Sequence, residues 1–97
     1  MKEISNINEL LQVFREKEVF QAYGLKRIGV FGSFARGEYF NDIDLYIDED
    51  IEFAKLLQLK RMLEKETGLP VDIMQKQFAE PVILYRALKD MQYAAAY

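Results

Sequence analysis

The chain has 97 residues, 51% of them apolar, and it contains neither cysteine nor histidine. That composition excludes disulfides, thiolate nucleophiles, imidazole bases and the usual zinc sites, so any metal must be a hard cation bound by oxygen. The formal net charge is −3, there is no basic stripe for a polynucleotide, and no apolar run approaches a membrane span. The lack of cysteine also fits a reducing compartment. We therefore expect one soluble, cytoplasmic domain over residues 1–97, without membrane contact and without nucleic acid as its direct substrate.

The N-terminal segment, residues 4–24, predicts a helix. Apolar residues recur at helical spacing from Ile4 to Phe14, and Asn6 with Glu9 three residues later resembles a capping box. The helix can continue through Val19, and it is expected to stop near Gly24.

Two strands flank a short turn in the next segment. Residues 26–31 are rich in β-forming side chains, and residues 32–38 are expected to form a turn or a single helical turn. Residues 43–48 then alternate in polarity, which is typical of a strand with one buried face. That buried face carries Ile43, Leu45 and Ile47, and the opposite face carries Asp42, Asp44, Tyr46 and Asp48.

A long helix and a short strand are predicted next. Asp50 is expected to cap the helix, and Gly68 and Pro70 are expected to end it. The side chains expected to point inward are Phe53, Leu56, Leu57 and Leu63. Residues 71–74 form the third expected strand.

The last helix is predicted to begin at Pro81, because proline suits a first helical turn. Its apolar stripe comprises Leu84, Ala87, Leu88 and Met91. Residues 91–97 favour a fourth strand over a frayed helix, since tyrosine and alternation suit a sheet edge. The order of elements predicts an α/β or α+β fold, in which a small mixed sheet of three to four strands has helices packed on one face.

Two aspartates lie two residues apart at the second strand. Side chains at this spacing point the same way, with Cα atoms roughly 6.5–7 Å apart, so Asp42 and Asp44 present two carboxylates to one point above the sheet. Asp72 stands between apolar neighbours on the third strand, and we expect its side chain on the same side. A lone pair of this kind is most often a solvated face, but three converging carboxylates are the arrangement of metal-dependent phosphoryl transfer.

An anion site is predicted beside these carboxylates, where the first strand ends. Gly32 and Ser33 present backbone N–H groups and a hydroxyl at the start of a helical turn, and Arg36 adds a charged fork, all of which suit a phosphate. A Gly-Ser pair alone is usually only a turn. A nucleoside triphosphate with its magnesium, however, needs an anion site and a cation site together. Tyr39 and Phe40 either wall this site or only close the turn.

A longer motif joins these features. The segment GSFARGEYFNDIDLYID, residues 32–48, resembles the motif of the minimal nucleotidyltransferases of the DNA polymerase β-like superfamily, which reads Gly-Ser-x-Ala-Arg-Gly, a loop, then Ser-Asp-[Ile/Val]-Asp-Leu. GLPVDIM, residues 68–74, resembles the third-carboxylate strand of that family. Asn41 replaces the usual serine, although it can still cap the turn, and the loop before Asp42 is somewhat shorter than in the family.

The resemblance implies the nucleotidyltransferase fold and the transfer of a nucleoside monophosphate, usually AMP from ATP, to a hydroxyl. It implies that Gly32 and Ser33 bind the triphosphate and that Asp42 and Asp44 bind two Mg²⁺ ions. Asp72 would be the third carboxylate, which assists the attacking hydroxyl as ligand or base. Proteins of this size resemble antitoxins that adenylylate a tyrosine of a HEPN-type ribonuclease toxin, so the resemblance also implies such a partner.

Two other functions are compatible with the sequence. One is a non-catalytic module that neutralises a partner protein sterically, and the other is a small-molecule nucleotidyltransferase that works with a separate subunit. Asp42, Asp44 and Asp72 together favour an enzyme, because a pure binder gains nothing from clustered charges that repel one another.

Overall fold

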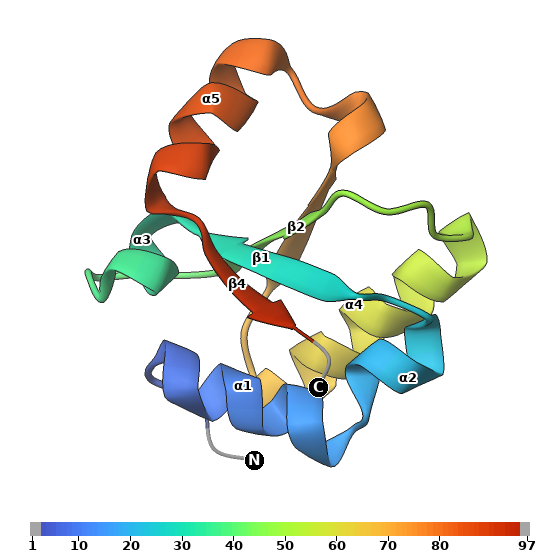
Figure 1. Cartoon of the computed structure of the whole chain (residues 1–97). Helices are drawn as coiled ribbons and strands as arrows, with labels where there is room; N and C mark the ends of the chain where they lie inside the picture. The colour runs from blue at the N-terminus through green and yellow to red at the C-terminus, as the bar shows by residue number, and fades with distance from the viewer. Residues whose placement is uncertain (1–2, 96–97) are drawn as a thin grey trace.

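Residues 3–95 are described by a computed structural model of the chain, shown in Figure 1. Its elements in chain order are α1 (Ile7–Glu16), α2 (Val19–Tyr23), β1 (Arg27–Phe31), α3 (Gly32–Arg36), β2 (Ile43–Ile47), α4 (Phe53–Thr67), β3 (Val71–Gln75), the 3₁₀ helix η1 (Lys76–Phe78), α5 (Pro81–Asp90) and β4 (Gln92–Ala95).

The strands form one four-stranded mixed sheet in the order β3-β2-β1-β4. β1 pairs antiparallel with both β2 and β4, whereas β2 and β3 are parallel. The mixed sheet predicted from the sequence is confirmed, and so is the strand in the tail as far as Ala95; residues 96–97 lie outside the described part. Because β2 lies between β1 and β3, the polar side chains of β2 stand beside those of β3.

One face of the sheet carries the hydrophobic core. Ile28 and Val30 of β1 and Leu45 of β2 are fully buried there. In Figure 1, α1, α2 and α4 cover this face from below, whereas α5 lies on the opposite side of the sheet. Helices were expected on one face only; this part of the prediction is wrong, because α5 packs on the other face of β1. On that opposite side, a Cβ atom at Gly29 would lie 2.4 Å from the sulfur of Met91, so the absence of a side chain lets the end of α5 pack closely on β1. The polar face of β2 and β3 is thus only partly covered.

The first helix does not continue unbroken through Val19, although its pattern allowed this. Glu18 adopts a left-handed conformation with φ of 50°, and this residue separates α1 from α2. The change of direction brings Phe20 of α2 back against Phe14 of α1, with ring centroids 5.9 Å apart in an edge-to-face contact. The predicted stop at Gly24 is confirmed, since this glycine is the left-handed C-cap of α2.

The start of α4 also differs from the prediction. Its N-cap is Glu52, without a side-chain cap, because the chain is still irregular between Asp50 and the first helical turn. Phe53 is 68% exposed and Leu57 only partly buried, because α4 turns other leucines toward the core instead. The side chains that α4 does bury include Leu56, Leu59 and Leu63.

The end of α4 and the start of α5 agree with the predictions from the sequence. α4 ends at Gly68, a left-handed C-cap, as predicted. α5 begins at Pro81, and Ala87 of its expected apolar stripe is buried, but Leu88 is 48% exposed because it lies at the margin of the helix face that packs on the sheet. Among residues 3–95, no helix is both long enough and apolar enough to cross a membrane.

Candidate active site

Three aspartates meet where β2 and β3 begin. Asp42 directly precedes β2, and Asp44 and Asp72 follow the first residues of β2 and β3. The parallel register of these strands pairs Asp44 with Asp72. One carboxylate oxygen from each of the three residues lies within 4.8 Å of the others. The structure therefore brings together the three carboxylates predicted from the sequence to form a site. Their chemical roles remain predictions.

Asp44 is the most strongly perturbed member of this acidic cluster. Its pKa is raised to about 6, chiefly by burial and further by the negative charges of Asp42 and Asp72. Ionisation of Asp44 beside two other carboxylates is unfavourable, and a cation bound among the three would stabilise the ionised form. The three residues offer only oxygen ligands, which hard divalent cations such as Mg²⁺ prefer. Asp72 is exposed, so the cluster is open to solvent on one side. The residues present thus fit a divalent metal ion.

Gly32 touches this cluster from the start of α3. Its φ is +78°, which side chains rarely tolerate, and a Cβ atom there would lie 2.5 Å from Oδ2 of Asp44. Only glycine allows the backbone to approach the carboxylate this closely. α3 has no side-chain cap at its N-terminus, so its first N–H groups and the partly exposed Ser33 are donors available to an anion. Anion donors and a cation site therefore lie side by side.

Arg36, at the other end of α3, is held between two carboxylates. Its Nε donates to Glu38 at 3.0 Å and its Nη1 donates to Asp90 of α5 at 2.7 Å. Binding a phosphate would require Arg36 to exchange one of these partners. Gln92 adds a second connection, because its Nε2 donates to the carbonyl of Ala35 at 2.8 Å. Sequence reasoning missed the contributions of Asp90 and Gln92, since partners so distant in the chain leave no local pattern.

The loop before β2 packs on α3. Phe40 packs edge-to-face on Phe34, with ring centroids 4.8 Å apart, and Tyr39 is 85% exposed. Both Tyr39 and Phe40 line a surface hollow of about 600 Å³ to which none of the three aspartates contributes. Phe40 therefore closes the turn. Asn41 was expected to cap this turn, but its side chain forms no hydrogen bond within residues 3–95, so the packing of Phe40 on Phe34 holds the loop instead.

Comparison with known proteins decides the family. A family model described as polymerase beta, nucleotidyltransferase, matches residues 8–93. The chain belongs to the polymerase β nucleotidyltransferase family. This nucleotidyltransferase is 34% identical over 89 residues to protein adenylyltransferase MntA of Thermococcus cleftensis, an alignment that covers 88% of this chain and 90% of MntA.

Solved structures show the same fold. Two crystal structures of mutants of the toxin–antitoxin pair MntA–HpeT match this nucleotidyltransferase with TM-scores of 0.69 and 0.67, at 19% and 18% identity. The matches cover 95% and 91% of this chain and 73% and 71% of the chains compared. The predicted nucleotidyltransferase fold is therefore confirmed, and the acidic cluster and Gly32 lie within the residues that the family model matches.

Proposed function

We propose that this nucleotidyltransferase transfers AMP from ATP to a tyrosine hydroxyl of a HEPN-type toxin and thereby acts as its antitoxin. Two comparisons support the proposal: MntA of Thermococcus cleftensis is a protein adenylyltransferase, and the fold matches a chain in a crystal structure of the toxin–antitoxin pair MntA–HpeT. The proposal places the protein in the cytoplasm, where ATP is available.

The observation that carries the proposal is the contact between Gly32 and the acidic cluster. The N–H groups at the start of α3 would bind the triphosphate, and Asp42, Asp44 and Asp72 would hold Mg²⁺, two ions in our proposal, on the same side of the sheet. Metal bound there would neutralise negative charge on the phosphates. Arg36 would add a contact to phosphate by exchanging a carboxylate partner.

The reaction requires a new phosphorus–oxygen bond. The acceptor oxygen would attack the α-phosphorus of ATP, while the bond from this phosphorus to the oxygen that bridges the α- and β-phosphates breaks and pyrophosphate leaves. Asp72 is the exposed member of the cluster, so an incoming hydroxyl can reach it. Its carboxylate would orient that hydroxyl and accept its proton. Asp42 and Asp44 would serve as metal ligands only.

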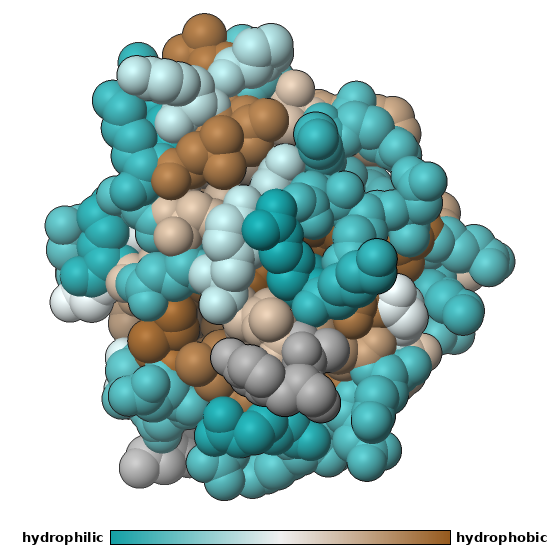
Figure 2. Space-filling view, in the orientation of Figure 1, coloured by the Kyte–Doolittle hydropathy of each residue, from teal (hydrophilic) through white to brown (hydrophobic). Residues whose placement is uncertain are grey.

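An apolar surface near the site favours a protein as the acceptor. In Figure 2, brown side chains are exposed over α5, which Figure 1 places above the sheet. The residues of η1 and α5 that contribute to this surface are exposed by 48–76%: Phe78, Val82, Ile83, Tyr85 and Leu88. The ion pair between Arg36 and Asp90 connects α5 to α3, so a protein bound on α5 would contact the helix that is joined to the one carrying Gly32.

Label transfer from ATP tests the proposal. The protein is incubated with ATP labelled at the α-phosphate, Mg²⁺ and a HEPN-type toxin from the same genome, and ribonuclease activity is measured in parallel. We expect label on the toxin and loss of its activity with the wild type and with Asp50→Asn, a matched change outside the cluster. Asp44→Asn should abolish both effects. Inhibition of the toxin by the wild type without labelling would refute the enzyme and favour a steric binder.

A further inference from the structure

β3, which carries Asp72, is an edge strand. It pairs with β2 on one side, and no further strand lies on its other side among residues 3–95. Every second residue of an edge strand directs its N–H and C=O groups away from the sheet. Val71 is such a residue, because the neighbouring Pro70 carbonyl accepts the N–H of Ile43 in β2 at 2.9 Å. The side chain of Val71 is fully buried, so its outward backbone groups need partners.

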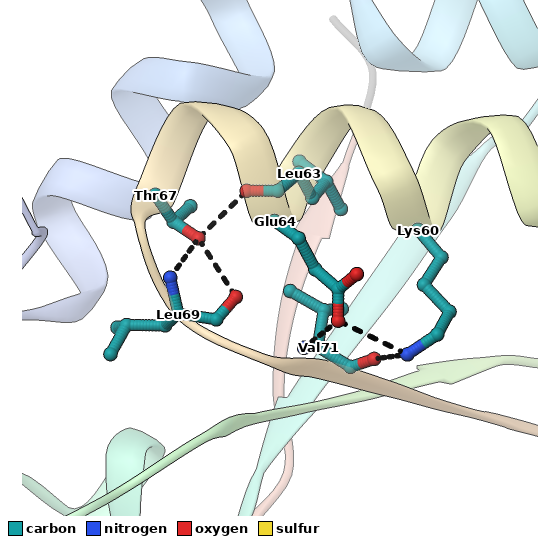
Figure 3. A network of polar contacts seen from close by, with 6 residues as sticks. All are labelled: Lys60, Leu63, Glu64, Thr67, Leu69 and Val71. Atoms are coloured by element: carbon teal, nitrogen blue, oxygen red, sulfur yellow. Dashed lines mark hydrogen bonds and ion pairs between the residues drawn. The ribbon is translucent and has the colours of Figure 1, made fainter. Parts of the chain in front are cut away.

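Two side chains of α4 provide those partners (Figure 3). Glu64 accepts the N–H of Val71 at 3.0 Å, and Lys60 donates to the carbonyl of Val71. Lys60 and Glu64 also pair with each other at 3.2 Å, one helical turn apart. The Val71 N–H is the main reason that the pKa of Glu64 is lowered; Lys60 lowers it further, and burial opposes both. The ion pair therefore binds the backbone of β3 as a neighbouring strand would.

The connection between α4 and β3 is also tightly held. Thr67 is fully buried, its hydroxyl donates to the carbonyl of Leu63 at 2.7 Å, and it accepts the N–H of Leu69 at 3.3 Å (Figure 3). Side-chain hydrogen bonds from successive helical turns of α4 therefore hold the connection to β3 and the first residue of that strand. A displacement of β3 along or away from β2 would have to break this network.

Asp72 has no such support of its own. Its side chain is exposed and forms no hydrogen bond or ion pair within residues 3–95. Its place opposite Asp44 therefore depends on the backbone of β3. We propose that Lys60 and Glu64 are positioning residues: by holding Val71, they keep Asp72 in register with Asp44 in the acidic cluster. The effect on AMP transfer rests on the proposed function, whereas the effect on the backbone does not.

Three variants separate this role from ordinary helix stability. Glu64→Ala removes the acceptor for the Val71 N–H, whereas Glu64→Gln keeps an acceptor oxygen in its place. Glu66→Ala is the matched control, because Glu66 lies on the same helix and forms a surface ion pair at 3.0 Å with Lys17, which follows α1. Within residues 3–95 it forms no hydrogen bond or ion pair with β3.

Amide hydrogen exchange of the metal-free protein is the first measurement, because it needs neither nucleotide nor acceptor. Glu64→Ala should accelerate exchange at Val71 and at Ile43, whose N–H is bonded to Pro70. Glu64→Gln should restore protection at both amides, and Glu66→Ala should leave both unchanged. Unaltered exchange in Glu64→Ala would overturn the inference.

Steady-state AMP transfer, measured well below the melting temperature, is the second measurement. Misplacement of a catalytic group by about 1 Å costs up to roughly 10²-fold, so we expect kcat of Glu64→Ala to fall roughly tenfold with the KM for ATP unchanged. Glu64→Gln should recover the rate. An unchanged kcat despite faster exchange would show that the ion pair does not position Asp72, which also overturns the inference. A wild type that transfers no AMP refutes the proposed function instead and leaves the exchange measurement to decide whether Lys60 and Glu64 hold β3.

Discussion

Replacing Asp44 by asparagine is expected to stabilise the metal-free protein at neutral pH. The carboxylate of Asp44 has a pKa of about 6 in the folded chain, raised by burial and by Asp42 and Asp72. A carboxyl group whose pKa is raised by folding contributes stability below its unfolded pKa and loses that contribution as the pH rises through the folded value. The amide side chain of Asp44→Asn cannot ionise, so the variant should not lose stability over this range.

The structure sets the size of this effect. The pKa is about 6 against an ordinary value of 3.8, and each unit of difference corresponds to about 1.36 kcal/mol, which gives at most about 3 kcal/mol. Asp44 is only partly buried, and screening by solvent reduces the expected gain to roughly 1–2 kcal/mol. For a chain of this size, each kcal/mol raises the Tm by roughly 4–8 °C.

Thermal and urea unfolding with excess chelator, from about pH 4 to pH 8, would measure this gain. The difference in unfolding free energy between Asp44→Asn and wild type should be near zero at the acidic end and grow with pH. Asp50→Asn, outside the cluster, should show no such trend. Mg²⁺ should stabilise the wild type more than Asp44→Asn. A difference that stays flat with pH, or a variant less stable than wild type at neutral pH, would refute the electrostatic reasoning.

Three further substitutions test the site. Gly32→Ala should lower the Tm and abolish ATP binding in calorimetry, because its Cβ would lie 2.5 Å from Asp44. Gly37→Ala is the control, since Gly37 is also at positive φ but a Cβ there meets no atom within 4 Å; it should lower the Tm only through backbone strain. Asp72→Asn should reduce AMP transfer by roughly 10²–10⁴-fold with little change in ATP affinity, and undiminished labelling would remove this residue from the mechanism. Arg36→Gln should weaken ATP binding with little change in Tm, since its ion pairs are exposed; unchanged ATP affinity would mean that it only connects α3 to α5.

The parts of the site that follow from local rules were predictable from the sequence. Strand periodicity places Asp42 and Asp44 on one side of β2, and the apolar neighbours of Asp72 place it on the same side of β3. Gly68 marks the end of α4 for a similar reason, because a left-handed C-cap favours glycine. Each of these inferences uses residues within a few positions of one another.

The features that were missed depend on tertiary contacts. Nothing near Glu18 indicates that it adopts positive φ, which is uncommon for a residue with a Cβ; the packing of Phe20 on Phe14 accompanies it. Phe53 matches the apolar period of α4, yet it is exposed, because the helix turns Leu56 and Leu59 toward the core instead. Lys60 and Glu64 look like an ordinary surface pair until β3 is placed beside them.

The electrostatics of the acidic cluster and the contacts of β3 are physically related. Repulsion among Asp42, Asp44 and Asp72 acts between β2 and β3. β2 is held on both sides, by β1 and β3. Within the described residues 3–95, β3 has a neighbouring strand only on the side from which the repulsion acts. A force that separates the carboxylates therefore acts mainly on β3, and the outer edge of β3 is the place where an opposing contact is effective. Lys60 and Glu64 bind that edge next to Asp72, so the chain can keep three like charges together before any cation neutralises them.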